Sequence, residues 1–147
     1  MGNYANENFP GSVQTQVTGL NDLGVTVGFW STQNTANNAN NNFGFYRIDG
    51  HYHTVNFPTG NNASPQVDQL LGVNDRDVAV GAYTTGSGSN AATHGFTWRP
   101  GYGFRTVDDP HGLGATTING VNDRGQLVGF YTDAAGNTDG FLATPQR

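Results

Sequence analysis

The sequence predicts an all-β protein with the form of a β-propeller, in a single domain over residues 1–147. The first observation is the composition: 22 glycines and abundant asparagine disfavour helices and suit tight turns. The second is that only 35% of residues are hydrophobic while 12% are aromatic, so large rings and β-branched side chains must supply the buried surface. The third is an internal repeat, whose elements follow in order.

Each repeat contains a Gly-x-Asn-Asp motif, which starts at Gly19, Gly72 and Gly120 with spacings of 53 and 48 residues. A short apolar stretch that ends in Val-Gly follows the motif, and an aromatic residue stands two or three positions after the valine. A polar loop and a Gly-Phe pair come next. The units span about 12–58, 66–110 and 115–147. The motif side chains that we expect to form turns are Asn21, Asp22, Asn74, Asp75, Asn122 and Asp123.

Turn signals divide each unit into four antiparallel strands. The first ends at the Asn-Asp turn, whose left-handed position holds glycine or, in unit two, Asp77. The second covers about 25–31, 78–84 and 126–132, and we expect its repeated glycine to leave room for an aromatic ring of a neighbouring unit. The third surrounds the Gly-Phe pair and ends at 49–50 or 100–103. The fourth covers 52–58 and 104–110, and unit three lacks it because the sequence ends just after the third strand.

The missing strand has a counterpart at the start of the sequence. Residues 4–10 read YANENFP and match YHTVNFP at 52–58, so Tyr4, Asn8, Phe9 and Pro10 recur at the positions of a fourth strand. We therefore interpret residues 3–10 as the last strand of unit three. Units of 45 to 50 residues with four short strands and fixed glycine and aromatic positions are typical of propeller blades.

Three blades are too few for a closed ring, because propellers typically have four to eight. The sequence therefore predicts a homodimer that forms one six-bladed ring, in which each N-terminal strand completes blade three of the partner. Two alternatives remain at this point: the strand returns to its own subunit, or it passes head-to-tail along an open polymer.

The pattern GVNDRGQLVGFYTD with its following Gly-Phe pair, residues 120–141, resembles the HAF-type extracellular repeat of bacterial secreted and surface proteins. All three units share it. The histidine that usually precedes Gly-Phe in that family is His94 in unit two, whereas Phe43 and Asp139 hold the position in units one and three. The resemblance implies a propeller-like fold and an extracellular or cell-surface location, and it implies no particular reaction.

Charge and composition exclude several partner classes. The net charge is −5 with six basic residues, which gives no electrostatic footprint for nucleic acid or an acidic membrane surface. No apolar run is long enough to span a bilayer, and the N-terminus lacks the features of a signal peptide. Cysteine is absent, which excludes disulfides and thiolate metal sites.

The connections after the second and fourth strands are long and polar, and in a four-stranded meander they emerge on one face. Binding residues on a rigid scaffold usually lie in such loops. We therefore predict a non-catalytic module that binds a glycan or another surface ligand there, as a lectin does. The alternative is that the loops only connect strands and that the aromatic rings belong to the core between blades. Candidate residues are Trp30, Tyr83, Tyr131, Asn40, Asn90, His94, Asp133 and Asn137.

No cofactor is expected. The turn aspartates are possible calcium ligands, but we expect them to cap their own turns, because this explains all three without a further assumption. His51 and His53 share one face of a strand and can chelate a transition metal, yet no third ligand is evident. Two of the carboxylates at Asp108, Asp109, Asp133 and Asp139 can form a glycosidase pair, but no unit departs from the repeat as a single active site would require. No phosphate loop or serine elbow is present. We expect no enzyme, and a self-assembling structural subunit is the alternative to the binding module.

Overall fold

The all-β prediction is confirmed by a computed structural model, which describes residues 2–33, 41–58, 63 and 65–146. Within these residues there is no α-helix, a 3₁₀ turn lies at Gly88–Asn90, and the strands form three antiparallel sheets. Sheet one contains β1 (Gln14–Leu20), β2 (Thr26–Ser31), β3 (Phe43–Ile48) and β4 (His51–Thr54). Sheet two contains β5 (Asp68–Val73), β6 (Ala79–Thr85), β7 (Ala92–Arg99) and β8 (Gly103–Thr106). Sheet three contains β9 (Thr116–Val121), β10 (Leu127–Thr132) and β11 (Thr138–Ala143).

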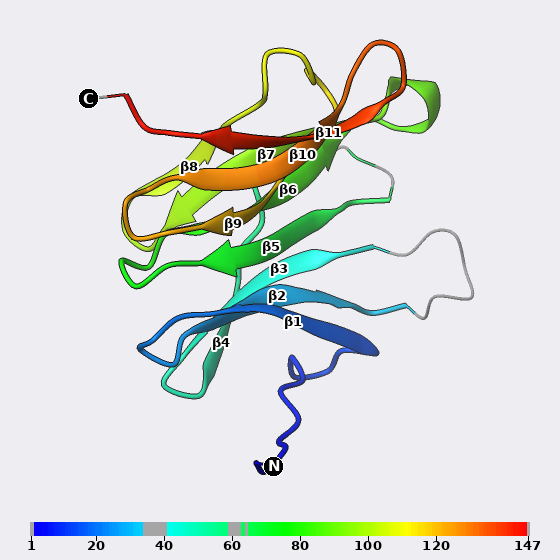
Figure 1. Cartoon of the computed structure of the whole chain (residues 1–147). Helices are drawn as coiled ribbons and strands as arrows, with labels where there is room; N and C mark the ends of the chain where they lie inside the picture. Colours follow the sequence, from blue (N-terminus) through cyan, green and yellow to red (C-terminus); the bar gives the residue numbers. More distant parts are fainter. Residues whose placement is uncertain (1, 34–40, 59–62, 64, 147) are drawn as a thin grey trace.

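Each sheet is a meander whose strand order follows the chain, and the sheets pack face to face in sequence order (Figure 1). β5 contacts β1, β2 and β3, and β9 contacts β5, β6 and β7, so every sheet uses its first strand to meet the preceding one. The N-terminal segment lies at the sheet-one end of this row, and the C-terminus lies at the sheet-three end (Figure 1). None of the helical structure in the described residues is long and apolar enough to cross a membrane.

The core consists of the side chains between neighbouring sheets. Val27, Leu70 and Phe96 are fully buried between sheets one and two. Val80 and Ile118 are fully buried between sheets two and three. Both faces of sheet two are therefore covered, whereas sheet one and sheet three each have a neighbour on one face only.

The turns have the backbone conformations that the sequence predicts. Asp49 and Gly50 both have positive φ, as a tight hairpin between β3 and β4 requires. Asp77 has φ 60° at the position where Gly24 and Gly125 have φ 79° and 76°. The aspartate thus adopts the left-handed conformation that glycine holds in the other two turns.

The prediction for the glycine in the middle of each second strand is wrong. A Cβ on Gly28 would lie 2.8 Å from Cε1 of Phe45 and would collide with the carbonyl oxygen of Gln16. Phe45 is the direct cross-strand partner of Gly28 on β3 of the same sheet. The ring that needs the space therefore comes from the same unit, not from a neighbouring one, because aromatic side chains in sheets commonly cover a glycine on the adjacent strand.

Candidate functional site

The segments that lead into sheets one and two each stack a phenylalanine on that sheet's second strand. Phe57, which precedes sheet two, stacks on Tyr83 with 3.8 Å between ring centroids and 2° between planes. Phe9, which precedes sheet one, stacks on Trp30 at 4.2 Å and 3°. The N-terminal segment thus meets sheet one in the same way as the connection after β4 meets sheet two.

The backbone in these segments is held by equivalent hydrogen bonds. The N–H of Phe9 donates to Oγ1 of Thr15 at 3.0 Å, and the N–H of Phe57 donates to Oδ1 of Asp68 at 2.9 Å. Before sheet three, the N–H of Asp109 donates to Oγ1 of Thr116 at 3.1 Å. Residues 9–15 therefore have the geometry of a connection that arrives from a preceding sheet.

Asp68 is the one charged acceptor in this set and is fully buried. Burial raises the pKa of its carboxyl above the usual value of 3.8, although hydrogen bonds from Gln66 and the Phe57 backbone lower it. A raised folded-state pKa means that protonation favours folding, so this contribution is lost as pH rises through that pKa. We expect wild type to lose stability relative to Asp68→Asn as pH rises from about 3 to 7, which urea unfolding at several pH values measures. A constant difference across that range would contradict the assignment.

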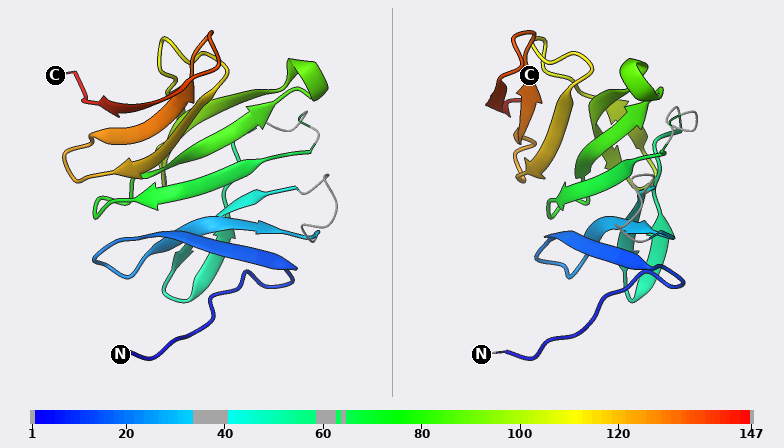
Figure 2. Two further views of the ribbon diagram at one scale, coloured as in Figure 1. Left: turned by 45° about the vertical axis from the view of Figure 1, so that its right-hand side comes forward. Right: turned by 90° about the vertical axis from the view of Figure 1, so that its right-hand side faces the viewer.

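Residues 2–9, upstream of this connection, belong to no strand. The Tyr4 side chain is 88% exposed. Glu7 is the polar anchor, since its Oε1 lies 3.2 Å from Nη1 of Arg47 and its Oε2 accepts a 3.0 Å hydrogen bond from Oγ1 of Thr26. Figure 2 shows the segment leaving sheet one on the side away from sheets two and three.

The two outer faces of the row expose apolar residues, each of which has at least one repeat equivalent that is buried. On sheet one, Leu20 is 67% exposed, whereas Val73, its equivalent on sheet two, is 8% exposed. On sheet three, Val128 is 46% exposed, whereas Val27 and Val80 at the same position are fully buried. The exposed apolar residues that we call the end-face residues are Val17 and Leu20 on sheet one and Val128, Phe130 and Leu142 on sheet three.

The Asn-Asp turns join neighbouring sheets. Asn21 Oδ1 accepts hydrogen bonds from the backbone of its own turn, and so do Asn74 Oδ1 and Asn122 Oδ1. The aspartates do something else: Asp75 Oδ1 accepts from the N–H of Asp22 at 2.7 Å, and Asp123 Oδ1 accepts from the N–H of Asp75 at 2.8 Å. The prediction that the aspartates cap their own turns is therefore wrong, because the asparagine performs this role and the aspartate binds the preceding turn.

The asparagine amides follow the same direction along the row. Nδ2 of Asn21 donates to the carbonyl oxygen of Asn74 at 3.0 Å, and Nδ2 of Asn74 donates to that of Asn122 at 2.9 Å. Nδ2 of Asn122 donates instead to Gln126 of its own turn. The aspartates repel one another, and the neighbouring Asp75 carboxylate raises the pKa of Asp22.

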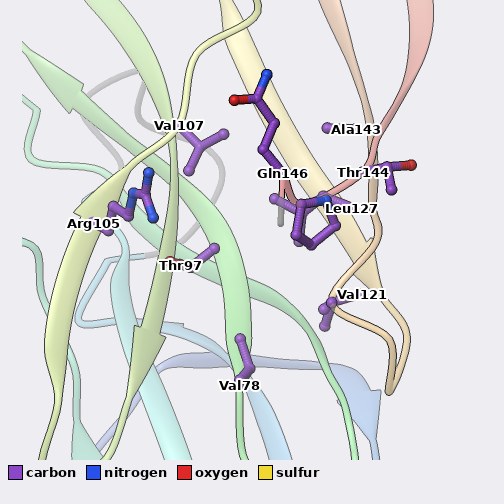
Figure 3. A pocket seen from close by; sticks show the side chains of 11 residues that line it. Val78, Thr97, Arg105, Val107, Val121, Leu127, Ala143, Thr144 and Gln146 are labelled. Atoms are coloured by element: carbon purple, nitrogen blue, oxygen red, sulfur yellow. The ribbon is translucent and has the colours of Figure 1, made fainter.

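A groove with a volume of about 420 Å³ opens between sheets two and three (Figure 3). Thr97, Arg105 and Val107 form the wall on sheet two. Leu127 and Ala143 belong to the wall on sheet three, and Thr144 to Gln146 continue it at the C-terminal end. Sequence reasoning missed this groove, although the small residues Thr97 and Ala143 at positions held by Tyr46 and Trp98 one unit earlier are a signal for it.

The residues predicted to bind a glycan occupy different environments. The loops after β6 and β10 lie on the side opposite the Asn-Asp turns (Figure 1). Trp30 is covered by Phe9, and Tyr83 is 5% exposed beneath Phe57, with its hydroxyl 2.9 Å from Oγ1 of Thr106. Neither ring offers a face on which a sugar can stack. Asn90 lies in the exposed 3₁₀ turn, and Asn40 lies outside the described residues.

Tyr131 is half-buried, as Trp30 is, but it differs from Trp30 in what covers its ring. Asp109 holds the position from which a phenylalanine stacks in the other units, and the His111 ring lies 6.2 Å from that of Tyr131. Partial desolvation, and after it the nearby carboxylates, raise the pKa of the Tyr131 phenol. Asp133 closes the next turn, where its Oδ1 accepts from the backbones of Ala135 and Asn137. These hydrogen bonds lower the pKa of Asp133, and they engage its carboxylate in holding the loop.

His94 links two strands on the loop side of sheet two. Its Nδ1 lies 2.8 Å from Oδ2 of Asp108, and its Nε2 lies 3.3 Å from Oγ1 of Thr85. Oδ1 of Asp108 accepts from the N–H of Gly95 at 3.1 Å. The hydroxyl, imidazole and carboxylate form a chain, but Asp108 also repeats the structural role of Asn56, which accepts from Gly44 in sheet one.

Metal ligands are not brought together in the part of the chain that the structure describes. His51 and His53 are exposed on β4, and no group of three histidine, aspartate or glutamate side chains there is placed to hold an ion. The turn aspartates lie one per turn, with their Oδ1 atoms engaged in the backbone hydrogen bonds described above.

No family model matches the chain, and neither a curated protein nor a solved structure shows significant similarity to it. The resemblance to HAF-type repeats therefore rests on the motif.

Proposed function

We propose that the chain is a self-assembling subunit and that two copies close one six-bladed propeller. The observation that carries this proposal is the exposure of the end-face residues at both ends of the row. Their repeat equivalents form the buried contacts between sheets within the chain, as Leu70 and Val80 do. Sheet three of one copy can therefore pack on sheet one of the second as sheet two packs on sheet three.

The polar groups of the Asn-Asp turns at the two ends of the row are also complementary to each other. Continuing the turn pattern, the N–H of Asp123 would donate to Oδ1 of Asp22 of the second copy, and Nδ2 of Asn122 would donate to the carbonyl oxygen of its Asn21. A Cβ on Gly19 would lie 3.0 Å from Cα of Gly72, so these glycines let the first strands approach closely. Gly120 provides the same clearance at the free end.

The N-terminal segment supplies the fourth strand of the neighbouring sheet three. Phe9 already stacks on sheet one as an incoming connection does, so residues 3–8 would arrive from a preceding sheet. The N-terminus and β11 lie at opposite ends of the row, which favours pairing between chains over return of the strand to its own sheet (Figure 1). Backbone pairing of an extended segment with an exposed sheet edge is a common mode of recognition.

Solution mass tests this function. We expect a discrete species of twice the 15.6 kDa chain mass by native mass spectrometry and light scattering. A folded monomer at micromolar concentration would overturn the assembly. A ladder of larger species would show instead that the same joint repeats in an open polymer, which would overturn the closed ring.

Glycan binding is a second function, and we propose it at Tyr131 because this ring lacks the stacked phenylalanine that covers its counterparts. Aromatic rings beside carboxylates and amides suit hydrogen bonding and stacking with sugars. A glycan array should lose its signal in Tyr131→Ala while Tyr102→Ala, which replaces an exposed tyrosine in the turn between β7 and β8, retains it. A blank array with intact wild type would leave assembly as the function. From the motif resemblance we infer that either function acts outside the cell.

A further inference from the structure

We propose that the edge of β11 and the groove beside it form a receptor for residues 3–8 of a second copy, with the Tyr4 side chain seated in the groove. This inference rests on the proposed assembly, and it specifies the register and the contacts of the joint.

The register follows from the two complete sheets. Phe45 on β3 pairs with Thr54 on β4, and Phe96 on β7 pairs with Thr106 on β8. Phe141 is the equivalent residue on β11, and the sequence match between 4–10 and 52–58 makes Asn6 the equivalent of Thr54, which aligns with Thr106. Asn6 therefore lies opposite Phe141. Two residues further along, Tyr4 lies opposite Ala143.

The groove has the position and chemistry for the Tyr4 ring. Between sheets one and two, Trp98 packs on Tyr46 with 5.3 Å between centroids and on Phe104 with 6.2 Å. Between sheets two and three, Ala143 and Thr97 replace Trp98 and Tyr46, and the place of Phe104 is left for Tyr4. An aromatic ring from the second copy fills this space, with its hydroxyl directed toward the polar end of the groove at Arg105 and Gln146 (Figure 3).

Two polar contacts complete the match. The hydroxyl of Tyr83 lies 2.9 Å from Oγ1 of Thr106, so Tyr131 can make the same contact with the Asn6 amide of the second copy. The N–H groups of Gly44 and Gly95 each donate at 3.1 Å to the side chain that begins the outgoing connection, Asn56 or Asp108. Asn8 holds that position in the N-terminal segment and would accept from Gly140.

The space beside Gly140 is open to an arriving strand. A Cβ on Gly44 would collide with the carbonyl oxygen of Val55, and one on Gly95 would lie 2.5 Å from that of Val107. A Cβ on Gly140 would lie 3.8 Å from its nearest neighbour, the carbonyl oxygen of Gly129. The space that the fourth strand fills in the two complete sheets is therefore open at Gly140.

Engineered disulfides test the register, since the chain has no cysteine of its own. Tyr4 and Ala143 would form a non-hydrogen-bonded pair, whose Cα separation of about 4.5 Å suits a disulfide. Under mild oxidation, Tyr4→Cys with Ala143→Cys should yield covalent dimer on a non-reducing gel. The matched control is Tyr4→Cys with Leu142→Cys, whose side chains would lie on opposite faces, and it should yield at least 10-fold less. Equal yields would overturn the register.

Gly140→Ala provides a second readout that does not depend on cysteine chemistry. The monomer should keep its circular dichroism spectrum, whereas dimer affinity should fall at least 10-fold because the methyl group meets the donated backbone. Gly95→Ala, the matched control, should unfold the chain itself. A Gly140→Ala ring with wild-type affinity would overturn the receptor even if wild type is a dimer, while a monomeric wild type would overturn the proposed function and the receptor together.

Discussion

Deleting residues 2–6 is expected to convert the two-chain ring into folded monomers. This deletion removes Tyr4 and Asn6 but keeps Glu7 and Phe9, which hold the rest of the segment on sheet one. The fold should persist because none of the deleted residues lies in a strand. The ring should weaken because each joint loses several backbone hydrogen bonds, at about 1 kcal/mol each, and a buried aromatic side chain at about 1.5–3 kcal/mol.

A loss of about 3 kcal/mol in each of the two joints sums to about 6 kcal/mol, which corresponds to roughly 10,000-fold in the dissociation constant. Sedimentation velocity over a concentration series measures it. The matched control replaces residues 2–6 with an equally long glycine-serine segment, which keeps the chain length and removes the side chains; it should retain part of the affinity through backbone pairing. A truncated chain that remains a tight dimer would contradict strand donation.

Much of the fold was predictable from sequence because its signals are local. Asp49-Gly50 and the Asn-Asp turns have chemistry that selects a backbone conformation within a few residues. The strand between two such turns then has little freedom, and the observed second strands begin within one residue of the predicted ones. The four-strand unit could therefore be predicted without knowledge of any contact between units.

The errors concern contacts between strands or sheets. The sequence contains the information that Gly28 and Phe45 recur at fixed offsets, but only the register shows that they lie opposite each other on adjacent strands. The role of Asp75 depends on how two turns stack, because its acceptor oxygen meets the N–H of Asp22 across 53 residues of sequence. Such distances are decided by the packing of the sheets, which no local signal encodes.

The candidate binding residues show the same limit. Trp30 and Tyr83 were predicted to face a ligand, yet Phe9 and Phe57 cover them. The match between residues 4–10 and 52–58 was visible in the sequence, but its consequence for the rings required the stacking geometry. Once that geometry is known, the absence of phenylalanine at Asp109 becomes the feature that distinguishes Tyr131.

Placing a charge on the outer face of sheet three should prevent ring closure without unfolding the chain. Val128 lies on the middle strand β10 and is 46% exposed, so Val128→Asp leaves its carboxylate in contact with water in the monomer. In the ring this position would be buried as Val27 and Val80 are, and an unpaired buried carboxylate costs several kcal/mol. We expect monomers at micromolar concentration with an unchanged circular dichroism spectrum.

Two matched variants separate the joint from the fold. Val80→Asp introduces the same charge at the equivalent position within the chain, which is fully buried, and should unfold the protein. Leu113→Asp removes another exposed apolar residue, 77% exposed on the connection between β8 and β9, and should leave the ring intact. Light scattering on the three proteins therefore shows whether the dimer is lost because the outer face of sheet three is changed or because any exposed apolar residue is replaced. If Val128→Asp remained dimeric, sheet three would not be the closing face, because a ring that packs sheet three against sheet one cannot keep that carboxylate in water.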